Sequence, residues 1–515
     1  MSALSEYLTA RVAQGALHNL RVRLFTHLQT LPMLYYDQTP LGDIISRCTA
    51  DVDTVDTLFS TGVASLVANL LQLATTAAAM LALSVQLSGI AVLVLPALAA
   101  ITQFFRVRVR DAERANRAAV GLMNTHLQET LSGVEAIRAF RREPVFVARV
   151  REALRQVIAA YNRSTAYNSF YPPLMAILSS LIVALLLWIG AGGSVAAWGI
   201  SIGTLTAYVL LFRRFFTPII SLGDDWQTVQ SALAGLERIA QVLAIPSEPL
   251  PSTAAGAQGD SADPAIELRE ATFGYAAGRP VLHDLSLQAR RGEHVALVGR
   301  TGAGKSSALH LLAGLYAPWS GQVSVAGRDP RTLDPEERRR VIGIVPQTVQ
   351  LFSESVFDNL TLGDATVRPA EVEHAAAIAG ADDFIRALPQ GYDTLLSGAG
   401  GGGGAQLSAG QRQLLALARA LVWNPRVLLL DEATAAIDSA SEAAFRTALR
   451  ADTAGSGRAV LTVAHRLSTA READRVLVMD AGRVVEAGTP AELMRRGGRF
   501  AAMVELEAAG WDWRE

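Results

Sequence analysis

The chain has 515 residues, a formal net charge of −2, and 50% hydrophobic against 18% charged residues. This length predicts two or three domains rather than one, and the apolar excess in the first half indicates a membrane protein. The near-neutral charge gives no indication of a nucleic-acid partner. The single cysteine, Cys48, excludes an intrachain disulfide and a cysteine-rich metal site. Met1 leads into a polar, arginine-bearing helical stretch, so we expect no signal peptide.

Two long stretches lack Asp, Glu, Lys, Arg and His, from Thr57 to Phe105 and from Ser164 to Phe212. Each can hold two helices of about 20 residues with a turn between them. Arginines lie on the outer flanks, which predicts that the flanks are cytoplasmic and that both hairpins point outward. We therefore expect four membrane spans, at approximately 57–83, 88–105, 169–190 and 198–220.

Arg213 and Arg214 allow two interpretations. Within the fourth span they would face a cavity and favour anionic or zwitterionic substrates. If that span begins near Val195, they only flank its cytoplasmic end.

The segments outside the charge-free stretches, 20–55 and 106–163, are charged and have helical patterns. Helices of this length are unnecessary for anchoring in the bilayer. We expect them to extend into the cytoplasm as levers that touch another domain.

The second half of the chain has a different pattern. Residues 246–264 are rich in Pro, Ser, Ala and Gly and predict a linker. From residue 265 to 515, short β-branched runs alternate with helical patterns, which is typical of an α/β domain. The predicted architecture is thus an all-α transmembrane domain over 1–245 followed by an α/β domain over 265–515.

A phosphate-binding loop opens the second domain. The apolar strand 294–298 continues into Gly-Arg-Thr-Gly-Ala-Gly-Lys-Ser at 299–306 and then into a helix. Glycines let successive backbone N–H groups point at phosphate oxygens. Lys305 is the only lysine among 46 basic residues, and it lies where the β- and γ-phosphates require a compact ammonium. Ser306 is the expected Mg²⁺ ligand.

Three other segments carry candidate functional residues. A second apolar strand, 426–430, ends in Asp431 and Glu432, which can hold the Mg²⁺ hydration shell and polarise the attacking water. Ser408 is the natural N-cap of a helix that runs to about Trp423. His465 follows the strand 459–463, which could neighbour the strand of Asp431.

Together these motifs resemble the ABC transporters of the exporter type, a half-transporter group that includes bacterial lipid and multidrug exporters. The resemblance implies that Tyr275 stacks on adenine, that Gln347 senses Mg²⁺, that Glu432 is the catalytic base and that His465 is the switch histidine. It also implies a nucleotide-binding set comprising Gly299, Arg300, Thr301, Gly302, Ala303, Gly304, Lys305, Ser306 and Ser307, with Ser408, Gly410 and Gln411 of the signature motif and Asp438 from the segment that links two ATP sites.

In this family two ATP domains enclose two ATP molecules, and each signature motif faces the phosphate loop of the other subunit. The resemblance therefore implies a homodimer or a heterodimer in the cell membrane, with the ATP domain in the cytoplasm. Segments around Gly42 and Ala139 would be its coupling helices. Substrates in the family are mostly amphipathic compounds, lipids or peptides.

The chain departs from the family pattern in three places. The family has six spans per half, and residues 4–20 resemble the end of the second, so the first span and most of the second are expected to be missing. Five glycines, 400–404, replace an acidic–basic pair, which we interpret as a flexible loop rather than a functional change. Ala409 replaces the first signature glycine, where a compact residue suffices.

The departures leave two other functions open beside export. One is a non-transporting membrane ATPase or regulatory subunit, because of the missing spans. The other is import through the exporter fold.

Overall fold

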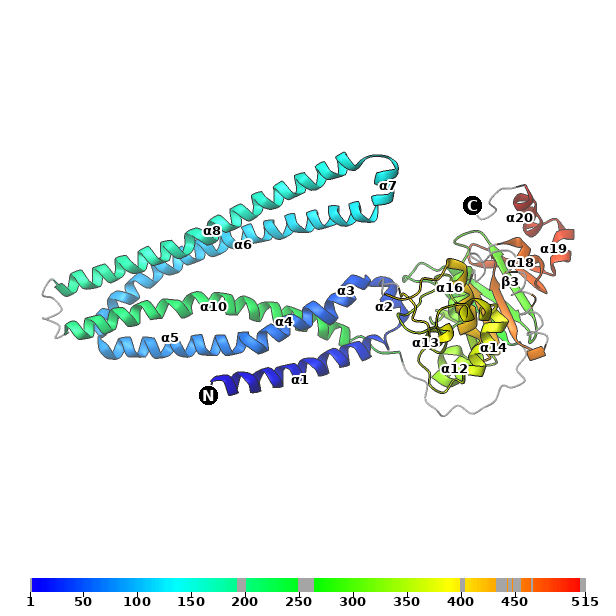
Figure 1. Ribbon diagram of the computed structural model, residues 1–515, viewed down its shortest axis with the longest axis horizontal. Coiled ribbons are helices and arrows are strands. Elements are labelled where there is room, and N and C mark those ends of the chain that lie inside the picture. The colour runs from blue at the N-terminus through cyan, green and yellow to red at the C-terminus, as the bar shows by residue number, and fades with distance from the viewer. Residues whose placement is uncertain are drawn as a thin grey trace. The chain divides into compact units, whose positions relative to one another are not determined.

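The computed structural model describes residues 2–191, 201–248, 264–398, 403–431, 442, 447, 455–464 and 466–509 (Figure 1). The chain folds as two units. Unit 1 comprises Met1–Phe25 and Ile45–Ala244, and unit 2 comprises Thr26–Ile44 and Ile245–Glu515. A short segment from the helical half of the sequence therefore belongs to the unit that carries the ATP-binding motifs.

Nearly all described residues of unit 1 are helical, and several of its helices are far longer than those of an average globular domain. Its elements, some of which continue into unit 2, are α1 (Ser2–Leu28), α3 (Leu41–Ser46), η1 (Arg47–Asp51), α4 (Val52–Thr57), η2 (Leu58–Gly62), α5 (Val63–Leu83), α6 (Val85–Ser132), α7 (Val134–Ala139), α8 (Glu143–Ala191) and α10 (Ile202–Leu243).

The helix boundaries agree with two predicted turns. Ser84 is extended and separates α5 from α6, and its hydroxyl accepts a hydrogen bond from the Leu87 N–H (3.3 Å), as an N-cap does. Gly133 separates α6 from the short α7, in the expected connection between two long helices. The predicted turn of the second hairpin falls mainly on 192–200, outside the described residues. By length and hydropathy, the described part of the chain contains one candidate span, Leu41–Leu83, so the other predicted spans stay predictions.

Polar pairs join the helices of unit 1. The carboxylate of Asp225 on α10 accepts hydrogen bonds from Ser65 (2.6 Å) and Asn69 (2.8 Å) on α5. Nearer the end of α10, Arg238 donates two hydrogen bonds to the buried carboxylate of Asp51. A charge that is buried with a partner in bidentate geometry avoids the cost of an isolated one. These pairs fix α10 against α5 and η1.

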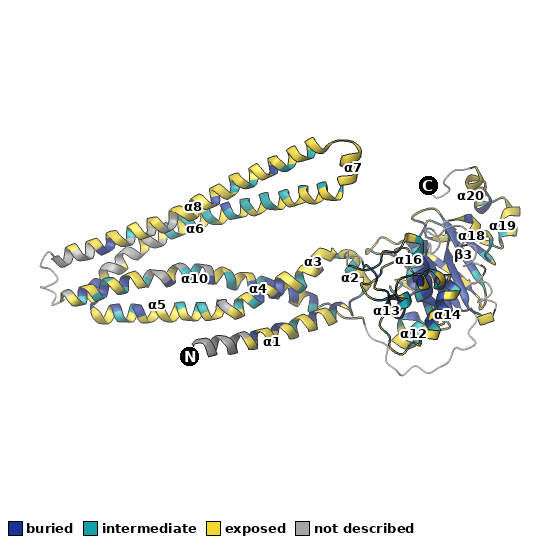
Figure 2. Cartoon of the chain, viewed as in Figure 1, coloured by how far each residue is buried: buried dark blue, intermediate teal, exposed yellow. Residues whose placement is uncertain are grey.

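The outer faces of unit 1 remain apolar. Val67, Leu70 and Leu71 on α5 are between 48% and 61% exposed, and Figure 2 shows exposed positions along the helices of this unit, whereas buried ones gather in the sheet of unit 2. An exposed apolar surface of this kind is typical of contact with lipid or with a second chain.

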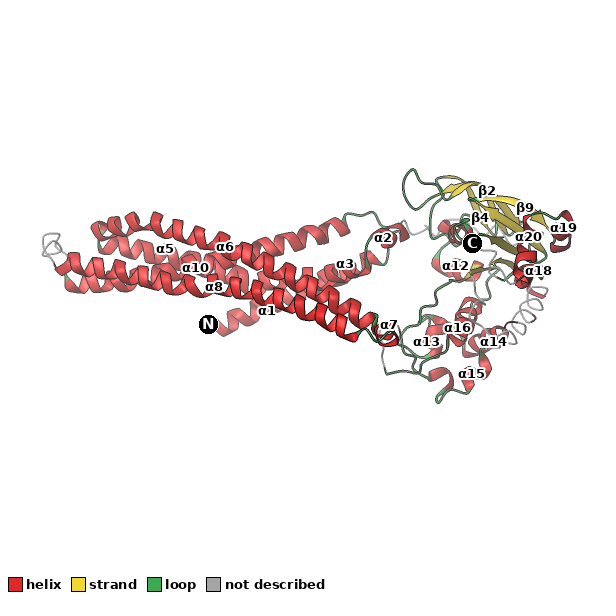
Figure 3. Ribbon diagram, turned by 90° about the horizontal axis from the view of Figure 1, so that it is seen from above, coloured by secondary structure: helices red, strands yellow, loops and turns green. Residues whose placement is uncertain are grey.

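Unit 2 contains two sheets (Figure 3). An antiparallel sheet has the order β2-β1-β4, and a six-stranded sheet has the order β5-β6-β7-β3-β8-β9, parallel except for β9. The strands are β1 (Ile266–Phe273), β2 (Leu282–Ala289), β3 (His294–Gly299), β4 (Ser320–Val325), β5 (Ile342–Val345), β6 (Val427–Asp431), β7 (Ala459–Val463), β8 (Arg475–Asp480) and β9 (Arg483–Gly488). Every residue of β6 and β7 is buried, as expected of central parallel strands covered on both faces.

The helices of unit 2 are mostly short. They are α2 (Met33–Gln38), α11 (Lys305–Leu312), η3 (Pro330–Thr332), α12 (Pro335–Val341), α13 (Val356–Thr361), α14 (Pro369–Ala379), α15 (Asp382–Arg386), η4 (Gly391–Asp393), α16 (Ala409–Leu421), α18 (Leu467–Arg471), α19 (Pro490–Arg496) and α20 (Arg499–Ala508). A second apolar core forms where α13 and α14 pack on α16, and it includes Leu428 and Leu430 of β6.

Asn359 on α13 is the polar centre of this second core and is fully buried. Its amide nitrogen donates to the carbonyls of Phe352 and Ser355 (both 3.0 Å), and its amide oxygen accepts from the Phe352 N–H (2.9 Å). Arg419 on α16 donates to the Asn359 carbonyl (2.8 Å) and to the Gln350 carbonyl (3.0 Å). One buried amide therefore holds the loop after β5, together with α16.

Replacing Asn359 with leucine, which has a similar volume, should leave the Phe352 N–H and carbonyl without these partners. The expected loss is about 2–3 kcal/mol, or a fall of roughly 5–10 °C in the unfolding temperature of the domain. Thermal unfolding of the purified full-length protein measures it, with the exposed Gln390→Leu as a matched control. Equal unfolding temperatures for the two variants would contradict this role.

Candidate functional site

The order of the central strands brings the predicted site residues to one edge of the sheet. β7 lies between β3 and β6, and all three are parallel. Their carboxyl ends carry the phosphate loop, Asp431 and the segment that leads to His465. The expectation that the strand before His465 neighbours that of Asp431 is confirmed, with Asp431 opposite Val463. This is the edge at which parallel sheets bind ligands.

Three glycines shape the loop between β3 and α11. Gly299, Gly302 and Gly304 have φ values of 155°, 81° and 93°, which are left-handed conformations that favour glycine. A Cβ on Gly299 would lie 2.2 Å from the Met479 carbonyl oxygen, so this position has no room for a side chain. The curled backbone before a helix N-terminus is an anion-binding shape.

Lys305 lies at the centre of this loop and is 7% exposed. Its ammonium donates to the carbonyl oxygens of Gly299 (2.8 Å) and Arg300 (2.9 Å). The loop thus holds the ammonium against its own backbone. Phosphate oxygens are stronger acceptors than neutral carbonyls, so a bound phosphate can attract the same group.

Oxygen ligands suited to Mg²⁺ lie beside the loop. Ser306 donates from its hydroxyl to the buried carboxylate of Asp431, at 3.2 Å. Gln347 is exposed and follows β5, whose Val345 is paired with Leu430 next to Asp431. A hydroxyl, a carboxylate and an amide carbonyl match the donor preference of Mg²⁺. The structure therefore brings Ser306 and Asp431 into contact and places Gln347 two residues after the strand that neighbours β6, and their role as metal ligands stays a prediction.

Tyr275, the predicted adenine-stacking residue, lies in an aromatic cluster with Phe273, Tyr316 and His310. Its ring meets those of Phe273 and Tyr316 edge-on, with centroids 5.0 and 5.4 Å apart. Its hydroxyl lies 3.1 Å from the hydroxyl of Ser307 and 3.3 Å from His310 Nδ1, both on α11. Burial raises the pKa of Tyr275 and lowers that of His310. Tyr275 is thus attached to the helix of the phosphate loop.

Ser408 is the N-cap of α16, as predicted. Its hydroxyl accepts from the Gln411 N–H (3.2 Å), and the Gln411 side chain accepts in return from the Ser408 N–H (2.9 Å). The helix ends at Leu421, two residues before the predicted end. Among the described residues, no hydrogen bond joins Ser408, Gly410 or Gln411 to the phosphate loop.

Several predicted residues lie outside the described part of the chain. They are Glu432, Asp438, His465 and residues 400–402 of the glycine run. Gly403 and Gly404 of that run are described, and they differ in the space around them: a Cβ on Gly403 would meet nothing within 4 Å. A Cβ on Gly404 would lie 2.4 Å from the Leu396 carbonyl carbon, so close backbone packing requires glycine there.

One contact was not predicted from the sequence and extends the site. The hydroxyl of Tyr316 donates to the carboxylate of Asp37 on α2, at 2.7 Å. Burial and this carboxylate raise the pKa of Tyr316, so it remains a protonated donor. The expected contact segment centred on Gly42, whereas the contact itself is made by α2, a few residues earlier. The 20–55 stretch was predicted to touch another domain, but only the fold could identify Tyr316 as its partner.

Comparisons with known proteins agree with this geometry. The profile of the ABC transporter transmembrane region matches residues 1–219, and the ABC transporter profile matches residues 282–435. A bacterial Atm1-family ABC exporter with ATP bound has a similar structure, with a TM-score of 0.78 and 28% identity over 98% of this chain and 87% of that one.

Named relatives are similar over nearly the whole chain. A putative ABC transporter ATP-binding protein of Streptococcus pneumoniae is 34% identical over 97% of this chain and 84% of its own length. An ATP-dependent lipid A-core flippase of Pseudomonas fluorescens is 34% identical, with 99% and 83% covered. A fatty acid ABC transporter of Mycobacterium tuberculosis is 32% identical, with 97% and 80% covered. The chain therefore belongs to the ABC transporter family, as a membrane protein of the exporter type in which a helical transmembrane domain is fused to an ATP-hydrolysing domain.

Proposed function

We propose that two copies of this chain form a dimer in the cell membrane, which binds ATP with Mg²⁺ and exports an amphipathic compound. Each chain crosses the membrane several times, and its ATP-binding unit lies in the cytoplasm. The observation that carries the proposal is the pairing of Ser306 with Asp431 beside the ammonium of Lys305. This arrangement provides ligands for Mg²⁺ and a cation for the phosphates in one place.

Each residue of the site would have a separate role in ATP hydrolysis. Backbone N–H groups of 299–306 and the Lys305 ammonium hold the phosphates and attract the negative charge that develops on them. Ser306, Asp431 and Gln347 would hold Mg²⁺, which neutralises charge between the phosphates. Glu432 would orient and deprotonate the attacking water, and His465, at the end of the next strand, would contact the γ-phosphate. Tyr275 would stack on adenine.

The second half of each site would come from the other chain. Ser408 and Gly410 lie at the N-terminus of α16, whose orphan N–H groups and dipole attract anions. These residues make no hydrogen bond to the phosphate loop within the described chain, which supports a partner subunit as the place of contact. Asp438 would lie in the segment that links the two sites.

A chain of contacts within unit 2 could carry the state of the ATP site toward the membrane domain. It runs from Ser307 on the phosphate-loop helix through Tyr275 and Tyr316 to Asp37. α2, which carries Asp37, is followed directly by the segment that leads into α4 and α5. Movement of α11, the phosphate-loop helix, would therefore be transmitted toward the membrane helices through the Tyr316–Asp37 hydrogen bond.

The substrate is most consistent with a lipid-like anionic or zwitterionic amphiphile. Two of the relatives are named for lipid A-core and fatty acid. Arg213 and Arg214 are exposed on α10 within the predicted fourth span, where a cation requires a cavity, a partner or a headgroup. Both features favour an amphipathic molecule with an acidic group.

Replacing Glu432 with glutamine should abolish turnover while ATP still binds. Loss of a general base typically costs about 10²–10⁴-fold in rate. Vanadate-sensitive ATP hydrolysis in membranes carrying the chain measures turnover, and Lys305→Ala is the companion variant that should weaken binding itself. Undiminished hydrolysis by the Glu432→Gln protein would sink the assignment of the base.

Shared sites predict that two inactive variants restore activity when they are combined. In a mixed dimer of Lys305→Ala and Ser408→Arg chains, one site has both defects and the other has neither. Copurification with two different tags selects the mixed dimers, in which about half of the sites should be intact, measured as ATP hydrolysis. If each chain built its own complete site, the mixture would stay as inactive as either parent.

Removing the hydrogen bond between Tyr316 and Asp37 of α2 should uncouple hydrolysis from export. Tyr316→Phe removes one hydrogen bond, worth about 1–3 kcal/mol when the acceptor is charged, and keeps the aromatic ring. We expect basal ATP hydrolysis to change less than about twofold while stimulation by lipid substrate falls. Asp37→Asn, which keeps a hydrogen-bond acceptor, should be milder. Normal stimulation in the Tyr316→Phe protein would remove the contact from the route.

A further inference from the structure

A polar cavity lies in unit 2, at the amino ends of the parallel strands. It has a volume of about 380 Å³ and is lined by residues that precede or begin β3, β6 and β7, among them Arg291, Arg426 and Arg458. The phosphate loop and Asp431 lie at the carboxyl ends of the same strands. At about 3.3 Å per residue, the five residues of β6 separate the cavity from Asp431 by about 15 Å. The cavity is therefore distinct from the ATP site.

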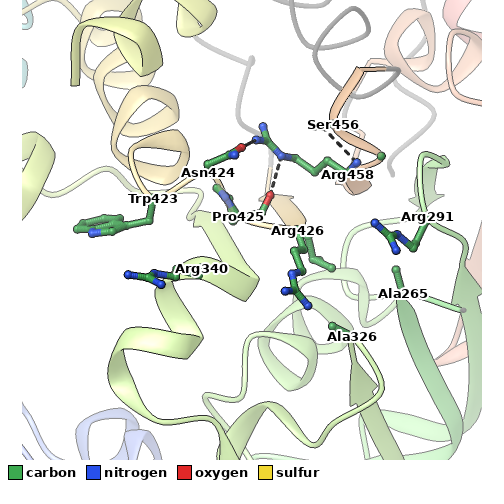
Figure 4. Close-up of a pocket in the computed structure, with 12 residues that line it drawn as sticks. Ala265, Arg291, Ala326, Arg340, Trp423, Asn424, Pro425, Arg426, Ser456 and Arg458 are labelled. Atoms are coloured by element: carbon green, nitrogen blue, oxygen red, sulfur yellow. Dashed lines mark hydrogen bonds between the residues drawn. The ribbon is translucent and has the colours of Figure 1, made fainter. Parts of the chain in front are cut away.

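Arginines dominate the lining. Four of the twelve lining residues are Arg291, Arg340, Arg426 and Arg458, and none of the twelve is acidic. Figure 4 shows Arg340 and Trp423 on one side, Arg291 on the other and Arg426 between them. The chain as a whole has a net charge of −2, so this concentration of positive charge is local. Like charges gathered in one cavity raise its affinity for an anion.

One of the four arginines, Arg458, is buried and stabilises the backbone that lines the cavity. Arg458 is 2% exposed, and its guanidinium donates to the Pro425 carbonyl (2.7 Å) and to the Asn424 side chain (2.6 Å). These bonds hold the turn between α16 and β6, where Asn424 has a left-handed φ of 48°. The backbone that presents Trp423 and Arg426 to the cavity is thus fixed in place.

Arg340 provides an independent indication of a ligand. It is the last of three successive arginines on α12. Arg338 donates to the Ala313 carbonyl, and Arg339 pairs with Asp364 (3.2 Å) and lies over the ring of Trp423. For the exposed Arg340 side chain, the described residues supply neither a hydrogen bond nor an ion pair, and it points to the cavity. Arg338 and Arg339 thus have partners within the domain, whereas Arg340 is available to a ligand in the cavity.

We propose that this cavity binds a small soluble molecule carrying two or more phosphate groups. Planar guanidinium groups match phosphate oxygens in two-point contacts, and the volume lies within the range of small-molecule pockets. Arg340 and Arg426 bind the phosphates, Arg291 adds charge, and Trp423 with Pro425 supplies an apolar wall. Because β6 begins at this cavity and ends at Asp431, a bound anion has a direct structural connection to the metal ligand.

Titration of the full-length protein with inorganic pyrophosphate tests the site. The Lys305→Ala background suppresses binding at the phosphate loop, so the result does not depend on the proposed hydrolysis mechanism. In that background, Arg340→Gln with Arg426→Gln should weaken binding by at least about tenfold, since two charge-assisted contacts are lost. The matched control, Arg495→Gln with Arg496→Gln on α19, removes the same charge elsewhere and should change affinity less than about twofold.

Isothermal titration calorimetry in detergent micelles gives the affinity, and the unfolding temperature without ligand checks that both double variants are folded. Binding that weakens selectively in the Arg340/Arg426 variant supports the site. Failure of pyrophosphate to bind the Lys305→Ala protein overturns the proposal. Equal affinities for the two double variants also overturn it, because they would show only the general charge of the domain.

Discussion

The parallel order of β6, β7 and β3 is the constraint on which the rest of the structure depends. Parallel strands present their carboxyl ends at one edge, so three segments far apart in sequence bring the phosphate loop, Asp431 and the end of β7 to the same edge of the sheet. β6 and β7 are buried along their whole length, and β3 is buried except at its first residue. A slip by one residue would move every side chain of a strand to the opposite face and disrupt the packing there. The 3.2 Å contact between Ser306 and Asp431, which are 125 residues apart, is a result of that register.

Sequence reasoning succeeded where function is encoded locally. The phosphate loop needs glycines at particular backbone angles and a lysine directly after them, and Ser408 caps its own helix, so both were recognisable from contiguous residues. Sequence reasoning could not identify the structural roles of Asn359 and Tyr316, because these roles depend on partners that only the fold brings near. Tyr316 follows the phosphate-loop helix by a few residues, yet its acceptor, Asp37, is 279 residues away. The five glycines show the intermediate case, since composition suggested flexibility and the position of Leu396 against Gly404 shows close packing.

The Tyr316–Asp37 contact is important because of the way in which the chain divides into two units. Thr26–Ile44 belongs to unit 2 although the segments on both sides of it belong to unit 1. The chain thus enters the ATP-binding unit, makes the Tyr316–Asp37 hydrogen bond and returns. Two covalent crossings and one charge-assisted bond make α2 difficult to detach, whereas the single crossing near Ile245 alone would allow independent motion. Coupling therefore depends on chain topology as well as on contact chemistry.

The carboxyl and amino edges of the six-stranded sheet differ in the charges of the side chains that lie there. At the carboxyl edge, the carboxylate of Asp431 accepts a hydrogen bond from Ser306 on α11, the residue that follows Lys305. At the amino edge, the described lining of the cavity includes four arginines and no acidic residue. Shared strands only five or six residues long join the two edges, and a well-packed interior transmits small displacements along them. An anion at the amino edge and a nucleotide at the carboxyl edge would then act on the same strands, and by linkage each would change the affinity for the other equally.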